Sequence, residues 1–149
     1  MVEICGEKME VYSSDDGIIL VAENKIYAYI DGEWYENLEC VGGDGLNHYY
    51  VTQNKRVIVY SFNQYTCNTI NVYESWREMV RDIRDYQYAM VRGGDSESDV
   101  EPNEDVLKWL DDLSKGCLGE WDYNNYTCKY YYIPGIMKPR IKELIEKEE

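Results

Sequence analysis

Apolar and polar residues alternate in short runs through the first half of the chain, and turn-forming residues separate these runs. Alternation with a period of two is typical of strands that bury one face. Asp31-Gly32 stands between two such runs, and this dipeptide is the strongest short signal for a two-residue hairpin turn. The runs that predict strands cover residues 9–11, 18–22, 26–30, 33–36, 48–52, 56–62 and 66–73. We therefore expect a mostly antiparallel sheet of hairpins over residues 1–73, with a loop at residues 42–45.

The hydrophobic period becomes helical after residue 73. Over residues 74–92 the apolar side chains recur at helical spacing, with Ser75 suited to start the helix and Gly93-Gly94 to end it. Asn103 suits the cap of a second helix, and Pro139 suits the first turn of a third. Trp76, Met79, Val80 and Ile83 should form the buried face of the first helix.

A late hairpin is expected between the second and third helices, with its turn at Asn124-Asn125. A two-residue turn at this position would place Cys128 opposite Trp121 and Cys117 opposite Tyr132, which keeps these two cysteines apart and disfavours a disulfide. None of the five cysteines forms a C-x-x-C motif, so a zinc ribbon is not indicated. We expect most of them to be buried as small apolar residues.

These elements predict an α+β fold: an N-terminal, mostly antiparallel β-sheet (hairpins or a meander) packed by two to three α-helices, with a late β-hairpin. The length of 149 residues fits a single domain. We expect this domain to cover residues 1–149, with the helix that begins near Ser75 lying on the sheet. Its expected parts are a β-rich segment (1–73), a helix (74–92), an acidic connector (93–103), and a helix, hairpin and helix (104–149).

The charge is strongly negative and unevenly spread. The chain contains 15 lysines and arginines and 29 aspartates and glutamates, which gives a net charge of −14. Residues 1–73 and residues 93–112 each carry a net charge of −7, whereas the remaining segments are neutral. Because nucleic acids and anionic membranes are bound by lysine and arginine, direct binding to either is not expected. The expected partner is a basic protein surface, although acidity that merely keeps the protein soluble remains the alternative.

Few residues suggest catalysis, a metal or a cofactor, and we predict none of the three. His48 is the single histidine and has no recognisable nucleophile motif around it. The acidic connector resembles a calcium loop only superficially, since Val100 and Val106 occupy the positions that need glycine and glutamate. The longest apolar run, residues 18–22, is far shorter than the ~20 residues of a membrane helix. With no visible signal peptide, we expect a cytoplasmic protein that does not contact a membrane.

Tyrosine is the most unusual part of the composition, with 16 tyrosines against one phenylalanine. A tyrosine ring covers apolar area while its hydroxyl remains available to water or a partner. Aromatic rings interleaved with carboxylates suit docking onto arginine and lysine. The predicted partner-binding residues lie in the β-rich segment and in the connector: Asp31, Glu33, Trp34, Tyr35, Glu36, Glu39, Asp95, Glu97, Asp99 and Glu101.

These features together favour a small acidic, non-enzymatic binding protein. It would inhibit or neutralise a protein with a basic, nucleic-acid-binding face, with carboxylates standing in for phosphates. Anti-CRISPR, anti-restriction and nuclease-immunity proteins, which occur in viruses and mobile elements, have a similar composition, and this likeness is one of composition alone. Two alternatives remain open: a tyrosine-lined binding module for a sugar or peptide, and a small hydrolase that uses paired carboxylates.

Overall fold

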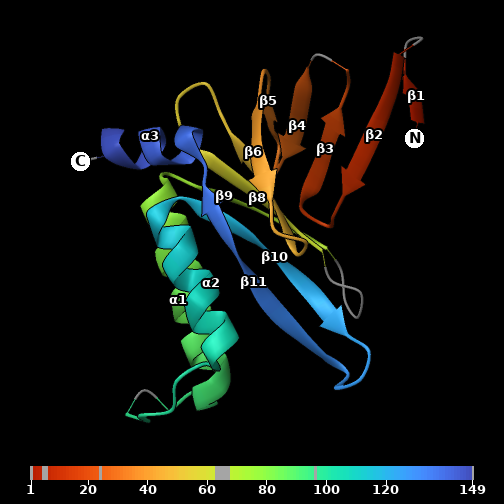
Figure 1. Cartoon of the computed structure of the whole chain (residues 1–149). Coiled ribbons are helices and arrows are strands. Elements are labelled where there is room, and N and C mark those ends of the chain that lie inside the picture. Colours follow the sequence, from red (N-terminus) through yellow and green to blue (C-terminus); the bar gives the residue numbers. More distant parts are fainter. Residues whose placement is uncertain (1, 5–6, 24, 63–67, 96, 149) are drawn as a thin grey trace. The chain divides into compact units, whose positions relative to one another are not determined.

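The computed structural model describes residues 2–4, 7–23, 25–62, 68–95 and 97–148 (Figure 1). Contacts along the chain divide it into two compact units, Met1–Glu74 and Ser75–Glu149. We call them the β unit and the helical unit, and each is described by itself. The expectations of a single domain, and of a helix lying on the sheet, stay predictions.

The β unit consists of two antiparallel meanders in which each strand pairs with the next along the chain. The first sheet contains β1 (Val2–Ile4), β2 (Glu7–Ser13), β3 (Gly17–Val21), β4 (Ile26–Ile30) and β5 (Glu33–Tyr35). The second contains β6 (Glu39–Gly43), β7 (Asn47–Val51), β8 (Val57–Ser61) and β9 (Thr69–Tyr73). Asp31 and Gly32 join β4 to β5 with φ angles of 49° and 83°, the left-handed pair that an Asp-Gly hairpin turn requires.

One hydrophobic core joins the two sheets of the β unit. Alternate residues of β3 and β4 meet alternate residues of the second sheet, as expected for strands that bury one face. The buried members of this core are Ile19, Ala28, Ile30, Leu38, Tyr50, Ile58, Tyr60 and Ile70. The opposite side of β3, β4 and β5 is therefore left for other contacts.

The helical unit contains three helices and a hairpin, and its helix ends follow the sequence signals. Its elements are α1 (Trp76–Arg92), α2 (Glu104–Lys115), β10 (Cys117–Asn124), β11 (Lys129–Met137) and α3 (Pro139–Lys147). The Ser75 hydroxyl accepts a hydrogen bond from the Glu78 backbone N–H, and the Asn103 side chain accepts one from Val106. Gly93 and Gly116 end α1 and α2 in the left-handed conformation.

The interior of the helical unit is organised around the first turn of α1. The Trp76 indole donates a 2.8 Å hydrogen bond to the Leu113 carbonyl, and Met79 is fully buried. Val80 and Ile83 are only half-buried, so the predicted buried face extends less far than expected. The apolar stripe of α1 becomes exposed toward its C-terminal end, where 61% of Met90 is accessible to solvent.

The predicted fold class is confirmed: antiparallel strands come first, followed by three helices and a late hairpin. The expected loop at residues 42–45 is wrong in part, because Gly42 and Gly43 belong to β6. A bulge between Cys40 and Gly42 accommodates these glycines in the strand.

The predicted register of the late hairpin is also wrong. Asn124 pairs with Lys129, so the turn spans residues 125–128, and Cys117 pairs with Met137. The Asn124 carbonyl accepts the Cys128 N–H at 2.8 Å, and this bond closes the longer turn. Cys40, Cys117 and Cys128 are free; because Cys40 and Cys128 are exposed, the expectation of buried cysteines is wrong for these two. Cys5 and Cys67 lie outside the described residues.

Candidate functional site

The side of β3, β4 and β5 that points away from the core carries apolar and aromatic side chains. Strand register places Ile18 opposite Tyr29 and Tyr29 opposite Trp34, while Leu20 lies opposite Tyr27. We call these five residues the aromatic face. Tyr29 and Trp34 keep 48% and 52% of their surface exposed, so large rings remain accessible to a partner here.

The rings of the aromatic face contact one another, and one of them is hydrogen-bonded to a carboxylate. Tyr27 stacks on Trp34 with ring centroids 5.7 Å apart, and Tyr29 lies 6.4 Å from Trp34. The Trp34 indole N–H donates a 2.9 Å hydrogen bond to the Glu36 carboxylate. Asp31, in the neighbouring turn, is exposed. Ring faces beside carboxylates provide the two groups that bind ammonium and guanidinium ions in proteins.

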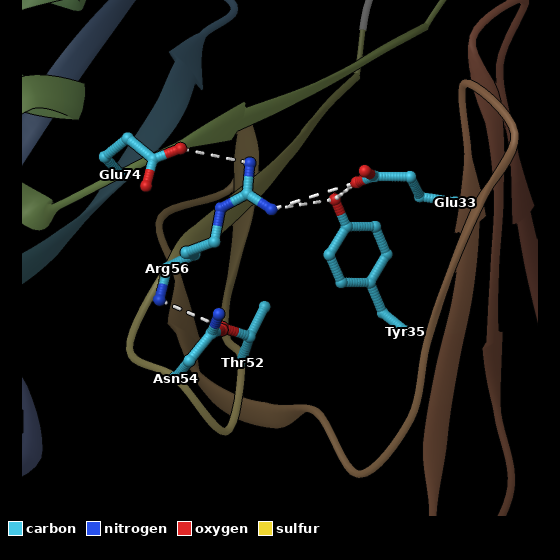
Figure 2. Close-up of polar contacts among 6 residues, drawn as sticks. All are labelled: Glu33, Tyr35, Thr52, Asn54, Arg56 and Glu74. Atoms are coloured by element: carbon cyan, nitrogen blue, oxygen red, sulfur yellow. Dashed lines mark hydrogen bonds and ion pairs between the residues drawn. The ribbon is translucent and has the colours of Figure 1, made fainter.

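A polar cluster lies around Arg56, at the end of the turn between β7 and β8 (Figure 2). Its guanidinium lies 3.2 Å from Glu74 and 3.8 Å from Glu33. It also donates a 3.2 Å hydrogen bond to the Tyr35 hydroxyl, which donates in turn to Glu33 at 2.6 Å. Burial, followed by this bond to Glu33, raises the pKa of Tyr35. Arg56, which precedes β8 of the second sheet, thus interacts both with β5 of the first sheet and with the residue that follows β9.

The Arg56 cluster changes the role of two predicted site residues. Glu33 and Tyr35 alternate with Trp34 along β5, so they point to the opposite side from the aromatic face. Glu33 is also partly neutralised by Arg56. Sequence analysis missed this arginine; the only signal was a charged residue at the start of an otherwise apolar run.

The remaining predicted residues are separated from the aromatic face along the fold. Glu39 is exposed at the start of β6 and therefore belongs to the second sheet. The four connector carboxylates, Asp95, Glu97, Asp99 and Glu101, are exposed and belong to the helical unit. Of the ten predicted residues, the structure brings Trp34 and Glu36 into contact, and Asp31 lies in the turn that precedes β5.

The connector is held by local hydrogen bonds close to the end of α1. The Asp95 carboxylate accepts the Glu97 backbone N–H at 3.0 Å, and the Val100 N–H donates to the Ser98 hydroxyl at 3.2 Å. The Arg92 guanidinium donates to the Val100 carbonyl at 2.9 Å. The connector carboxylates therefore lie on a turn-rich segment that follows the helix.

His48 lies among aromatic rings of the β unit. Its ring makes edge contacts with Tyr12 and Phe62, at centroid distances of 5.2 and 4.7 Å. Its Nδ1 atom is 3.4 Å from the Tyr50 hydroxyl. Burial lowers the pKa of His48, so the ring is neutral at pH 7. Within the described residues, this environment is that of a packed histidine beside two tyrosines.

Comparison with protein-family models, curated proteins and solved structures gives no match to this chain. In the described part of the chain, no three histidine, cysteine or carboxylate side chains are grouped so that they could hold a metal ion. None of the described helices combines the length and apolarity needed to cross a membrane.

Proposed function

We propose that this protein is an acidic, non-enzymatic binding protein that engages a basic, nucleic-acid-binding face of another protein and neutralises it. The observation that carries the proposal is the aromatic face, where exposed Trp34 and Tyr29 lie beside the Glu36 carboxylate. A partner's arginine or lysine can place its charge over a ring while it pairs with a carboxylate.

The net charge of −14 supports the same partner class. A strongly negative protein is steered toward positive surfaces, and the same field disfavours direct contact with nucleic acid. Carboxylates of the β unit and of the connector would then occupy positions that phosphates take on the basic face. The partner would be released as salt increases, because exposed charges are screened beyond about 8–10 Å at physiological ionic strength.

The test compares two variants that each remove three charges and keep side-chain size. One carries Asp31→Asn, Glu36→Gln and Glu39→Gln in the β unit. The other carries Glu97→Gln, Asp99→Asn and Glu101→Gln in the connector. Glu33 is left intact because it pairs with Arg56, and Asp95 because it accepts a backbone hydrogen bond.

Each variant is immobilised and used for affinity capture from the source cell at 50 and 500 mM salt. We expect the parent to capture a nucleic-acid-binding protein at low salt alone, and the β-unit variant to capture much less of it. If both variants retain the same protein equally at both salt concentrations, its binding does not depend on these carboxylates and the proposal is wrong. Loss in the connector variant alone would move the contact surface to the helical unit.

A further inference from the structure

The β unit contains a hollow of about 360 Å³ on the side of the first sheet that faces away from the aromatic face. Strand β2 contributes Glu10 and Tyr12, and strand β7 contributes His48 and Tyr50. Its remaining lining residues are Val21, Ile26, Cys40, Gly42, Gly43 and Gly45. The hollow thus brings together the single histidine, two tyrosines, a carboxylate and two aliphatic side chains.

The glycines of β6 make room for this hollow. A Cβ atom at Gly43 would lie 3.0 Å from the His48 ring and 2.9 Å from the Asn47 carbonyl oxygen. Any other residue at position 43 would therefore displace the histidine or the strand. The following turn is held by Asp44, which is 1% exposed and accepts hydrogen bonds from the Asn47 N–H at 2.9 Å and the Tyr49 hydroxyl at 2.6 Å. The position of His48 is thus determined by the backbone around it.

The electrostatics of the hollow favour a positive ligand. Glu10 is exposed and accepts a 2.7 Å hydrogen bond from the Tyr12 hydroxyl. No lysine or arginine is among the described residues that line the hollow. The rings of Tyr12 and His48 meet at 84°, so aromatic walls stand at a steep angle to each other next to the carboxylate. Aromatic rings around a carboxylate form the usual environment for an organic cation.

We infer that this hollow binds a single organic cation: an ammonium or guanidinium group carried on an aliphatic chain. The charged group would lie against Glu10 and the aromatic walls, and the chain would contact Val21 and Ile26. Such a cation has two sources, a free polyamine-like molecule or a lysine or arginine side chain of a basic partner. The second source rests on the proposed function, whereas the first does not. Anions are disfavoured because Glu10 would repel them.

Protonation of His48 should oppose this binding. The charged and titratable groups around its ring are Glu10 and Tyr12 from β2, Cys40 from β6, Asp44 from the following turn, Tyr50 from β7 and Tyr60 from β8. Burial outweighs the attraction of Glu10 and Asp44, so the pKa of His48 is below its usual 6.5. The hollow is therefore free of a competing cation at pH 7, and a cation should bind more weakly as the pH falls below this pKa.

The single histidine makes the test direct, because its Hε1 proton gives an NMR signal that no other histidine in the chain can overlap. The probe is n-butylammonium at constant ionic strength, with 1-butanol as its neutral analogue and glucose to represent a sugar. We expect a saturable shift of the His48 signal with n-butylammonium alone. By linkage, if protonation weakens binding tenfold, the pKa of His48 falls by roughly one pH unit at saturation.

Two single-carboxylate variants of the same unit provide the matched comparison. Glu10→Gln preserves shape and leaves an acceptor for the Tyr12 hydroxyl, and it should weaken probe binding by roughly tenfold. Glu36→Gln removes one charge from beside the aromatic face and should change probe binding less than twofold. The inference is wrong if the probe causes no saturable shift, if 1-butanol or glucose shifts the signal equally, or if both variants weaken binding alike.

A third arm distinguishes the two sources of the cation and separates this inference from the proposed function. If a partner's side chain fills the hollow, the captured partner should displace n-butylammonium from the parent, and Glu10→Gln should weaken the complex. If the partner and the probe bind together, the hollow serves a free cation. If the probe does not bind, the inference that the hollow binds a cation is wrong. The proposed function of the aromatic face is unaffected by that result, because its own charge variants test it.

Discussion

Replacement of Arg56 by methionine tests whether the cluster in Figure 2 holds the two sheets of the β unit together. Methionine keeps an unbranched apolar stem and removes the charge. Glu74 then loses a partner at 3.2 Å, Glu33 loses one at 3.8 Å, and the Tyr35 hydroxyl loses a donor at 3.2 Å.

The expected cost follows from the exposure of these partners. The Arg56 side chain is 27% exposed, but those of Glu33 and Glu74 are 66% and 72% exposed, so solvent screens both ion pairs. Each exposed pair contributes about 0.2–1 kcal/mol. The hydrogen bond from the charged guanidinium to the neutral Tyr35 hydroxyl is long, at 3.2 Å, and contributes about 1 kcal/mol. Arg56→Met should therefore lower the free energy of unfolding by about 1–3 kcal/mol.

Urea unfolding followed by far-ultraviolet circular dichroism measures this difference, with Lys25→Met as a control. Lys25 is an exposed cation of the same unit, so its replacement makes the same change in net charge. We expect Lys25→Met to unfold within about 0.5 kcal/mol of the parent. If Arg56→Met is as stable as Lys25→Met, the cluster does not stabilise the unit. A loss above about 4 kcal/mol would show that the ion pairs are shielded from solvent and would also refute the calculation.

Three further predictions concern the interior of the helical unit and one tyrosine of the β unit. Leu113→Ala should cost about 2–5 kcal/mol in thermal or urea unfolding, because Leu113 is 0% exposed and its replacement leaves a cavity; a cost below 1 kcal/mol would contradict its place in the core. Ile83→Asp should lower the free energy of unfolding by several times less than Leu113→Asp does, since Ile83 is half-buried; equal losses would show that Ile83 is a core residue. The hydrogen bond to Glu10, aided by burial, raises the pKa of Tyr12 from 10.0 to about 12, so Tyr12 contributes stability below pH 10 that is lost as the pH rises toward 12. Tyr12→Phe should therefore lose less stability than the parent over that range, and identical pH profiles would contradict the shift.

Local signals in the sequence account for most of the fold. Asp31-Gly32 specified its turn because few residue pairs tolerate two successive positive φ angles. Ser75, Asn103 and Pro139 mark helix starts because a capping side chain or a fixed φ acts over only a few residues.

Local patterns in the sequence did not predict an ambiguous turn or the contacts between distant residues. A hydrogen bond from the Cys128 N–H to the Asn124 carbonyl closes the turn of the late hairpin and thereby sets its register. A pair of asparagines in the sequence does not distinguish a two-residue turn from this four-residue one. The Arg56 cluster joins residues 33 and 74, and no local pattern indicates that they meet. The hollow beside His48 is lined by Cys40 and Gly42, which flank a bulge in β6, and the glycine-rich run alone predicts a loop from residue 42 onward.

The candidate site was predictable in composition and only partly in geometry. Tyrosines and carboxylates in one segment indicated a surface for basic groups, and Trp34 with Glu36 forms such a pair. Alternation along β5 then divides the predicted set, because Glu33 and Tyr35 point to the other side. A list of neighbours in sequence does not separate the two faces until the register of the strand is known.

Displacement of nucleic acid from the captured partner tests the central claim most directly. A labelled nucleic acid is bound to the partner, and its fluorescence anisotropy is followed as this protein is added. The parent should release the nucleic acid, and a variant with Trp34→Ala and Glu36→Gln should require at least tenfold more protein to do so, since it lacks a ring and a charge of the aromatic face. Retention of the nucleic acid at saturating parent protein, or equal release by parent and variant, would contradict the claim that the aromatic face occupies a basic, nucleic-acid-binding surface.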